Sequence, residues 1–260
     1  ITLSRLFAFH VVLLPILLIA IVFFHILALH EIGSNNPDGI DVKKHLDEDG
    51  VPLDTKPFFP YDISHDIFAL GGFLIIFCSV VFFFPTGGGY IIEYVNYEPA
   101  NPLSTPAHIV PSWYYTPFYA MLRAVDFPLF GLTAKFLGFA TMMAAVAIFA
   151  VLPWLDRSKV RSCNYRPIYK WFMMGFFVNF FVLGYVGMLP AEGLYLLIAR
   201  VGLLYYFGFF FIITPFVGWI EKPSKLPLSI SDVYAKNIAP NIGGGEKGIP
   251  SPAMQKDTNL

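Results

Sequence analysis

Five long apolar runs constrain this chain more than any other feature. Each run is long enough to cross the roughly 30 Å hydrocarbon core of a bilayer. Because backbone in lipid must satisfy its own hydrogen bonds, and these runs do not alternate with a period of two, they are predicted to be helices. The predicted fold class is an all-α membrane protein, a bundle of five transmembrane helices with short interfacial helices in the outward loop. The runs cover residues 6–29, 66–84, 136–155, 171–189 and 201–220.

The composition agrees with this class and excludes several others. Of the 260 residues 56% are hydrophobic and 13% are charged, whereas a soluble domain carries about 25% charged residues. The formal net charge of −1 gives no sign of the basic patch that nucleic-acid binding needs. Cys78 and Cys163 form no CxxC pair, which excludes a disulfide framework, a zinc knuckle and a c-type haem attachment.

The basic residues predict the orientation of the bundle. Thirteen of the 17 lysines and arginines lie in the loop 31–64, in the loop between the third and fourth runs, and in the tail. Positive charge favours the inner side, so these segments are predicted to face the cytoplasm or matrix. The basic cluster Arg157–Arg166 is interpreted as a topology signal and a lipid headgroup contact.

The chain is predicted to have three parts. Residues 1–64 hold the first helix and an inner loop, residues 65–223 hold the other four helices, and residues 224–260 form an irregular tail. The connection 85–134 faces outward. It is rich in proline and aromatic residues and nearly free of charge, so its segment Pro102–Val125 is predicted to lie in the interface or to fold back against the bundle.

Two histidines stand inside the first apolar run. His10 and His25 are fifteen residues apart, which places them about 22 Å apart along a helix, one near each face of the hydrocarbon layer. They either hydrogen-bond to neighbouring helices or act as axial haem ligands, one per leaflet. At a spacing of fifteen residues the two side chains point about 60° apart around an ideal helix. A spacing of fourteen would leave them about 40° apart in the opposite direction. Pro15 lies between them and can kink or rewind the helix.

Five motifs carry a resemblance to a known family. Together they cover nearly the whole chain, up to about Pro223, and their order is LFAFHVVLLP, FFHILALHEIGSNNPDGI, PYDISHDIF, NPLSTPAHIVPSWYYTPFYAMLRA and PWLDRSKVRSCNYRP. The sequence resembles the cytochrome b family of the respiratory cytochrome bc complex (ubiquinol–cytochrome c reductase), in the portion from the fourth to the eighth transmembrane helix. The first three helices of that family, with one histidine ligand for each haem, are absent from this sequence.

The resemblance implies two b-type haems as cofactors. His10 corresponds to an axial ligand of the low-potential haem on the outer side, and His25 to a ligand of the high-potential haem on the inner side. Each haem then needs a second histidine from the N-terminal helices, in the same chain or a separate one. The family usually spaces these ligands by fourteen residues. Arg5 either pairs with a haem propionate or is an interfacial arginine.

The resemblance also implies a quinone-reduction site at the inner surface. His30 and Asp66 correspond to quinone contacts of the family, and Ser34 is a weaker candidate. His65 stands where the family often has lysine and is a candidate proton source. On the residues alone, His30 is an interfacial histidine at a helix end and Asp66 is an acid in the first turn of a helix.

The quinol-oxidation site implied on the outer side centres on a tetrad, Pro111, Ser112, Trp113 and Tyr114. The family commonly has glutamate as the second residue, which accepts a proton from quinol. Ser112 has no useful pKa for that role. We therefore expect Glu93 to replace the missing carboxylate; the alternative is an exposed loop glutamate.

One further residue completes the candidate catalytic set of Glu93, Ser112 and Tyr119. Tyr119 corresponds to a tyrosine that lines the same pocket, and Arg123 follows it four residues later.

The implied function is that of a cytochrome b subunit, active only within a complex. It oxidises quinol at the outer face, passes electrons through the haems to quinone at the inner face, and translocates protons. The implied partners are the N-terminal cytochrome b helices, a Rieske iron–sulfur protein, a c-type cytochrome subunit and membrane lipid, in a dimeric complex. The implied location is a bacterial cytoplasmic membrane in preference to a mitochondrial one. The residues alone also allow a proton-coupled transporter or channel using membrane His and Asp, or a haem-free assembly scaffold.

Overall fold

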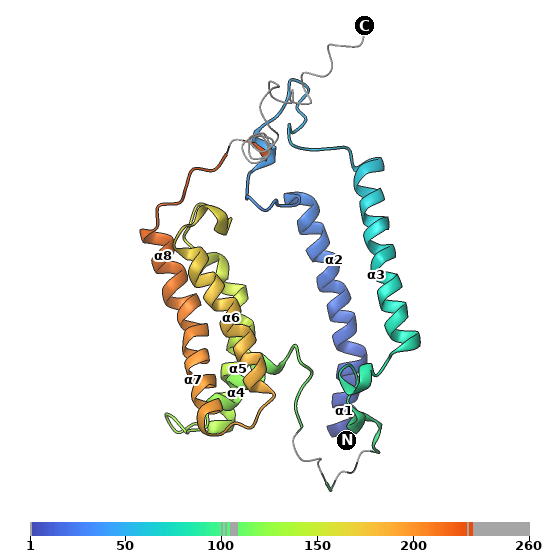
Figure 1. Ribbon diagram of the computed structural model, residues 1–260, viewed down its shortest axis with the longest axis vertical. Coiled ribbons are helices and arrows are strands. Elements are labelled where there is room, and N and C mark those ends of the chain that lie inside the picture. Colours follow the sequence, from blue (N-terminus) through green and yellow to red (C-terminus); the bar gives the residue numbers. More distant parts are fainter. Residues whose placement is uncertain (1, 100, 102, 105–108, 228, 231–260) are drawn as a thin grey trace, which may run out of the picture. The chain divides into compact units, whose positions relative to one another are not determined.

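The computed structural model describes residues 2–99, 101, 103–104, 109–227 and 229–230 (Figure 1). Within these ranges five helical segments are long and apolar enough to cross a membrane, and there are no strands. The predicted all-α membrane class is therefore confirmed. Most of the predicted tail 224–260, and Pro102 in the outward loop, lie outside the described residues. The spans are Ser4–Ile32, Phe58–Phe83, Ala134–Leu155, Tyr169–Gly187 and Gly193–Ile220.

The chain divides into two units, residues 1–53 with 226–260, and residues 54–225. In the first unit, α1 (Thr2–Ala8), the π turn η1 (Phe9–Leu13) and α2 (Leu14–Ile32) form one continuous helix. The short turn η2 (Val42–Lys44) follows. The side chains of this long helix are exposed from residue 4 to residue 32, and they are almost all apolar, as expected of a helix whose surroundings are lipid or other membrane helices.

The second unit contains the remaining elements. Its helices α4 to α8 pack against one another as a bundle, coloured green to orange in Figure 1. The elements are η3 (Phe58–Asp62), α3 (Ile63–Phe83), η4 (Gly87–Gly89), η5 (Tyr94–Tyr97), α4 (Thr116–Ala124), α5 (Ala134–Leu155), η6 (Cys163–Tyr165), α6 (Tyr169–Gly187), α7 (Gly193–Gly208), η7 (Phe209–Ile213) and α8 (Thr214–Ile220).

The short helix α4 is buried in this bundle. Of the two predicted placements of the outward segment, folding back against the bundle is the one observed for α4. It contacts α5, α6 and α7, and small side chains on α4 together with a glycine on α5 allow the close approach. A Cβ on Gly138 of α5 would collide with the carbonyl oxygen of Leu122. The buried residues of α4 are Thr116, Pro117, Ala120, Met121 and Ala124.

Two π turns occur at the same position relative to a proline. η1 ends two residues before Pro15, and η7 ends two residues before Pro215. In each, the next N–H donates to a carbonyl five residues back, Leu14 to Phe9 and Thr214 to Phe209. Proline has no N–H for the carbonyl four residues before it. Widening the preceding turn by one residue gives the carbonyls other partners without breaking the helix.

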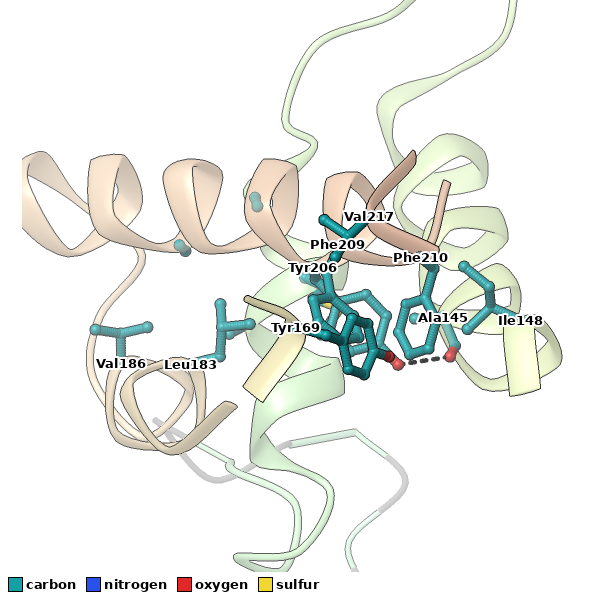
Figure 2. Packing of buried hydrophobic residues seen from close by; sticks show 13 residues of the cluster. Ala145, Ile148, Tyr169, Leu183, Val186, Tyr206, Phe209, Phe210 and Val217 are labelled. Atoms are coloured by element: carbon teal, nitrogen blue, oxygen red, sulfur yellow. Dashed lines mark hydrogen bonds between the residues drawn. The ribbon is translucent and has the colours of Figure 1, made fainter. Parts of the chain in front are cut away.

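Aromatic side chains fill the centre of the bundle (Figure 2). The ring of Phe176 lies 4.6 Å from Phe209 and 5.3 Å from both Tyr206 and Phe210, centre to centre. Tyr206 is fully buried, and its hydroxyl donates to the carbonyl of Ala145 at 2.9 Å, the dashed line in Figure 2. A buried tyrosine needs such a partner, so this bond orients α7 against α5.

The fifth span starts earlier than the hydropathy predicts. The apolar run begins at residue 201, directly after Arg200, but the helix begins at Gly193. Arg200 lies inside the helix with its charge compensated. Its Nε donates to the carbonyl of Ala124 at 3.2 Å, and its Nη2 forms an ion pair with Asp126.

A buried ionic network joins the ends of α5, α6 and α8. Arg166, only 1% exposed, donates to Asp156 at 2.9 Å and to Glu221 at 3.3 Å, and stacks on the Tyr169 ring. The other oxygen of Glu221 accepts the N–H groups of Ile168 and Tyr169 at 2.6 and 2.9 Å. The carboxylate thus caps the start of α6, where free N–H groups and the helix dipole favour an anion. The interpretation of Arg157–Arg166 as surface charge alone is wrong for Arg166.

Replacing Glu221 with alanine should destabilise the second unit strongly. The change leaves Arg166 buried with one carboxylate fewer, and breaking a buried pair costs about 3–5 kcal/mol. Denaturant titration of the detergent-solubilised protein, followed by circular dichroism, measures the loss. The matched control is Asp62→Ala, which removes an exposed pair with Lys56 and should cost at most about 1 kcal/mol. If both variants lose the same small amount of unfolding free energy, the network does not contribute to stability as proposed.

Candidate functional site

A cavity of about 1080 Å³ opens in the outward connection. Its lining brings together Glu93, at the start of η5, and three tetrad residues, Pro111, Ser112 and Trp113. Ser112 and Trp113 are exposed and Pro111 is partly buried. A carboxylate and a hydroxyl therefore face one space that also has an aromatic wall.

The tetrad is held by the first turn of α4. The N–H of Tyr115 donates to the carbonyl of Ser112 at 2.8 Å. The hydroxyl of Thr116 donates to the carbonyl of Trp113 at 2.7 Å. Because Thr116 is only 1% exposed, the position of Trp113 follows that of the buried helix.

Tyr114 and Tyr119 are placed differently from the rest of the predicted outer site. The cavity lining includes neither of them. The Tyr114 ring packs edge-on to Trp113 at 5.5 Å between ring centres. Tyr119 is partly buried, and the guanidinium of Arg123 lies 4.4 Å from its ring centre. Tyr119 thus presents one ring face to a cation, not to the cavity.

Arg123 joins α4 to the end of α6. Its Nη2 donates to the carbonyls of Val186 and Gly187 at 3.2 and 2.8 Å. These carbonyls belong to the last residues of α6, where a cation is favoured by the helix dipole. With Arg200 on the last carbonyl of α4, two arginines cap the C-terminal ends of neighbouring helices.

In the first unit His10 lies inside η1 and His25 in α2, both exposed. In the described part of the chain neither imidazole has a hydrogen-bond partner. The π turn takes up one extra residue, so fifteen residues turn the helix about as far as fourteen α-helical ones. This brings the angular offset from about 60° toward about 40° in the opposite sense. The predicted local rewinding before Pro15 is therefore observed.

The predicted inner contacts of the first unit lie where α2 ends. His30 is in the last turn of α2, and Ser34 follows the terminating Gly33; both side chains are exposed. Lys43 reaches back to this end and donates to the carbonyl of Glu31 at 3.3 Å. Arg5 is exposed on α1, at the other end of the same helix.

The predicted inner contacts of the second unit lie in the first turn of α3. Asp66 is exposed there, where the helix dipole favours its charge. Nδ1 of His65 lies 2.8 Å from the carbonyl of Tyr61. Both side chains are thus at a helix end and open to their surroundings.

The two histidines suit cofactors that each take one ligand from this helix, one at His10 and one at His25. Among the residues that the structure describes, no three His, Cys, Asp or Glu side chains gather as a metal site. A haem iron needs only one or two protein ligands along its axis. Two exposed imidazoles without hydrogen-bond partners in the described part of the chain fit that requirement.

Sequence reasoning named Glu93 and three tetrad residues but missed the rest of the cavity lining, and the missed residue most distant from the tetrad in the sequence is Met188. Met188, directly after α6, lines the cavity with the tetrad. It stands 75 residues after Trp113 in the sequence and lies in an apolar stretch with no local signal. Only the packing of α6 against α4 brings it there.

These features define a multi-pass helical membrane protein with polar groups at set depths along its helices. Two family models match it in succession, "Cytochrome b(N-terminal)/b6/petB" over residues 1–117 and "Cytochrome b(C-terminal)/b6/petD" over residues 99–207. The chain belongs to the cytochrome b family.

Similar proteins agree in sequence and in fold. The chain is 50% identical to cytochrome b of Rhodospirillum rubrum over 230 residues, covering 88% of this chain and 52% of that protein. It is 47% identical to cytochrome b of Allochromatium vinosum, covering 87% and 55%. A chain of a structure titled "Hyperthermophilic respiratory Complex III" matches with a TM-score of 0.72 and 31% identity, covering 85% and 52%. The chain thus spans about half the length of these relatives.

Proposed function

We propose that this chain is part of a cytochrome b subunit that oxidises quinol at the outward face of a bc-type complex and reduces quinone at the inward face. The observation that carries the proposal is the continuous helix α1–η1–α2, which presents His10 and His25 at two depths. Its π turn brings the two imidazoles closer to a common face. Membership of the cytochrome b family supports the same conclusion.

His10 and His25 would each bind one b-type haem, with the second histidine supplied by N-terminal cytochrome b helices. When bound, the two haems supply one-electron transfer across the membrane. The chain's own part is to set the two depths and the rotation of the imidazoles. Arg5 lies five residues before His10, and in this proposal its guanidinium pairs with a haem propionate.

The outward cavity would hold the quinol. Oxidation of one quinol to quinone releases two protons and two electrons. One electron leaves to a Rieske iron–sulfur partner and the other is passed inward. The hydroxyl of Ser112 cannot act as a base near neutral pH, so the carboxylate of Glu93 accepts one proton and the second leaves to solvent. Trp113 forms an aromatic wall of this cavity.

The remaining outer residues would act around the cavity. Pro111 and Ser112 form its lining with Trp113, and Tyr114 supports Trp113 through its edge-on ring contact. Tyr119 lies outside the cavity lining, so it would act on the quinol only from behind the wall, with Arg123 on its ring face.

On the inward side, His30 and Ser34 of the first unit and Asp66 of the second would each take part in quinone reduction. Reducing one quinone takes up two protons and two electrons, so two quinol oxidations supply the electrons for one quinone reduction. Ser34 would donate a hydrogen bond to a quinone carbonyl, and His30 and Asp66 would deliver protons. His65, adjacent to Asp66 in the first turn of α3, would refill that acid.

The complete protein would work within a multi-subunit assembly. Its partners would be the N-terminal cytochrome b helices, the Rieske protein, a c-type cytochrome subunit and membrane lipid, in a dimeric complex. Relatives in Rhodospirillum rubrum and Allochromatium vinosum favour a bacterial cytoplasmic membrane. The basic loops would face inward, so protons are released outside and taken up inside.

The helical phase of the two histidines can be tested by changing its length. Deleting Val12 removes the extra residue of η1, so both haems should be retained. Inserting one alanine after Ala20, in the regular part of α2, turns one histidine about 100° against the other and should remove at least one b-type haem. The reduced-minus-oxidised absorbance spectrum of the complete complex measures both. Full haem content after the insertion would contradict the proposal, and a wild-type complex without a b-type band would favour the transporter or the scaffold.

The role of Glu93 predicts a specific pH dependence. Only an ionised carboxylate can accept a proton, so the wild-type rate of quinol oxidation should show an acidic limb, in which it falls as the pH is lowered. Glu93→Gln should lower the rate by about 10²-fold or more and remove this acidic limb. Steady-state quinol oxidation by the complex between pH 5 and 9 measures both effects.

Two further variants sharpen the test of Glu93. Glu98 also lines the cavity, and Glu98→Gln should leave the acidic limb in place; loss of the limb in this variant alone would transfer the role to Glu98. Ser112→Glu restores the carboxylate that the family commonly has in the tetrad. Adding it to Glu93→Gln should recover much of the rate.

A further inference from the structure

We propose that the C-terminal end of α6, Gly187 with Met188, positions the tetrad and completes the cavity, so that Gly187 is a positioning residue for quinol oxidation. The inference rests on the proposed function of the cavity. It concerns a part of the molecule that is more than 70 residues from the tetrad in the sequence.

The first step is the contact between α6 and the start of α4. A Cβ on Gly187 would collide with the carbonyl oxygen of Thr116 and lie 2.8 Å from its carbonyl carbon. The obstacle is backbone, which cannot turn aside as a flexible side chain can. Only glycine at this position lets α6 approach α4 so closely.

The second step links this contact to the tetrad. Thr116 holds the carbonyl of Trp113 through its hydroxyl at 2.7 Å and its N–H at 3.3 Å. Any displacement of the Thr116 backbone is therefore transmitted to Trp113 and to Ser112 before it. Gly187 acts on the cavity through these two bonds.

The third step is that α6 and α4 are tied together at a second point. Arg123 lies seven residues, about two turns, after Thr116 on α4, and donates to the carbonyls of Val186 and Gly187. The same end of α6 is thus in contact with both ends of α4. This makes the spacing of the two helices a fixed feature of the site.

Met188 supplies the direct contact with the cavity. It follows Gly187 and lines the cavity together with loop residues that come before α4. One short segment therefore sets the position of the tetrad and forms part of the wall.

The chain offers a matched control on the same helix. Gly184 is three residues before Gly187, and a Cβ there would lie 3.5 Å from Cγ of Pro117 and 3.6 Å from Oγ1 of Thr116. These are ordinary contacts, so Gly184→Ala adds the same methyl group to the same surface without forcing the helices apart.

The test compares Gly187→Ala and Gly184→Ala in the complete complex. We expect Gly187→Ala to raise the KM for quinol on the order of tenfold, because the displaced Trp113 and Met188 line the cavity that would bind quinol and misplacement of about 1 Å costs up to 10²-fold in kcat/KM. The kcat should change less, and the b-haem spectrum and haem reduction from the inward site should match wild type. Gly184→Ala should stay within about twofold of wild type. Equal KM values in the two variants overturn the inference.

A second variant decides the case in which Gly187→Ala fails to assemble. Met188→Ala leaves the backbone contact in place and shortens only the cavity wall, so a several-fold rise in KM supports the inference and an unchanged KM overturns it. A wild-type complex that binds haem but does not oxidise quinol overturns the proposed function, and the inference with it. An active wild type with equal KM values in the variants overturns the inference alone.

Discussion

A polar group inside hydrocarbon must find a partner within the protein, and this requirement governs the described structure. It explains why Pro15 and Pro215 are each preceded by a π turn, since both would otherwise leave a carbonyl without a donor. It explains why Asn179 donates to the carbonyl of Gly202, and Tyr206 to that of Ala145. Such bonds join one helix to the next at fixed heights.

Hydrogen bonds of two arginines join the outward connection to the bundle. Arg123 and Arg200 each donate to a carbonyl at the end of a neighbouring helix. Because α4 receives one of these contacts and supplies the other, it cannot shift without disturbing both. The tetrad ends two residues before α4 begins at Thr116, so the geometry of the cavity depends on the contacts that α4 makes with the bundle.

The parts of this fold that were predictable depend on local chemistry. Five spans followed from hydropathy, and a rewinding before Pro15 followed from proline and the histidine spacing. The start of the fifth span was misplaced because the charge of Arg200 is cancelled by Asp126, 74 residues away. Arg166 was misread for the same reason, since its partner Glu221 lies 55 residues further on. A pairing between charges that lie far apart in the sequence cannot be predicted from the local sequence around either residue.

The candidate site shows the same difference between local sequence and long-range packing. Glu93 could be associated with the tetrad because both lie in one loop, whereas Met188 reaches the cavity only through the packing of α6 on α4.

Two polar side chains of the first span are exceptions to this rule of pairing. His10 and His25 are exposed on an apolar helix and have no hydrogen-bond partner in the described part of the chain. Arg123, Arg200 and Arg166 each donate to at least one carbonyl or carboxylate, although one buried nitrogen of Arg123 and one of Arg166 have no partner among the described residues. The described fold gives these two imidazoles no hydrogen bond, although they lie fifteen residues apart on a helix of apolar side chains. Axial ligation of one haem at each histidine, as proposed above, would give both imidazoles a partner through one chemistry.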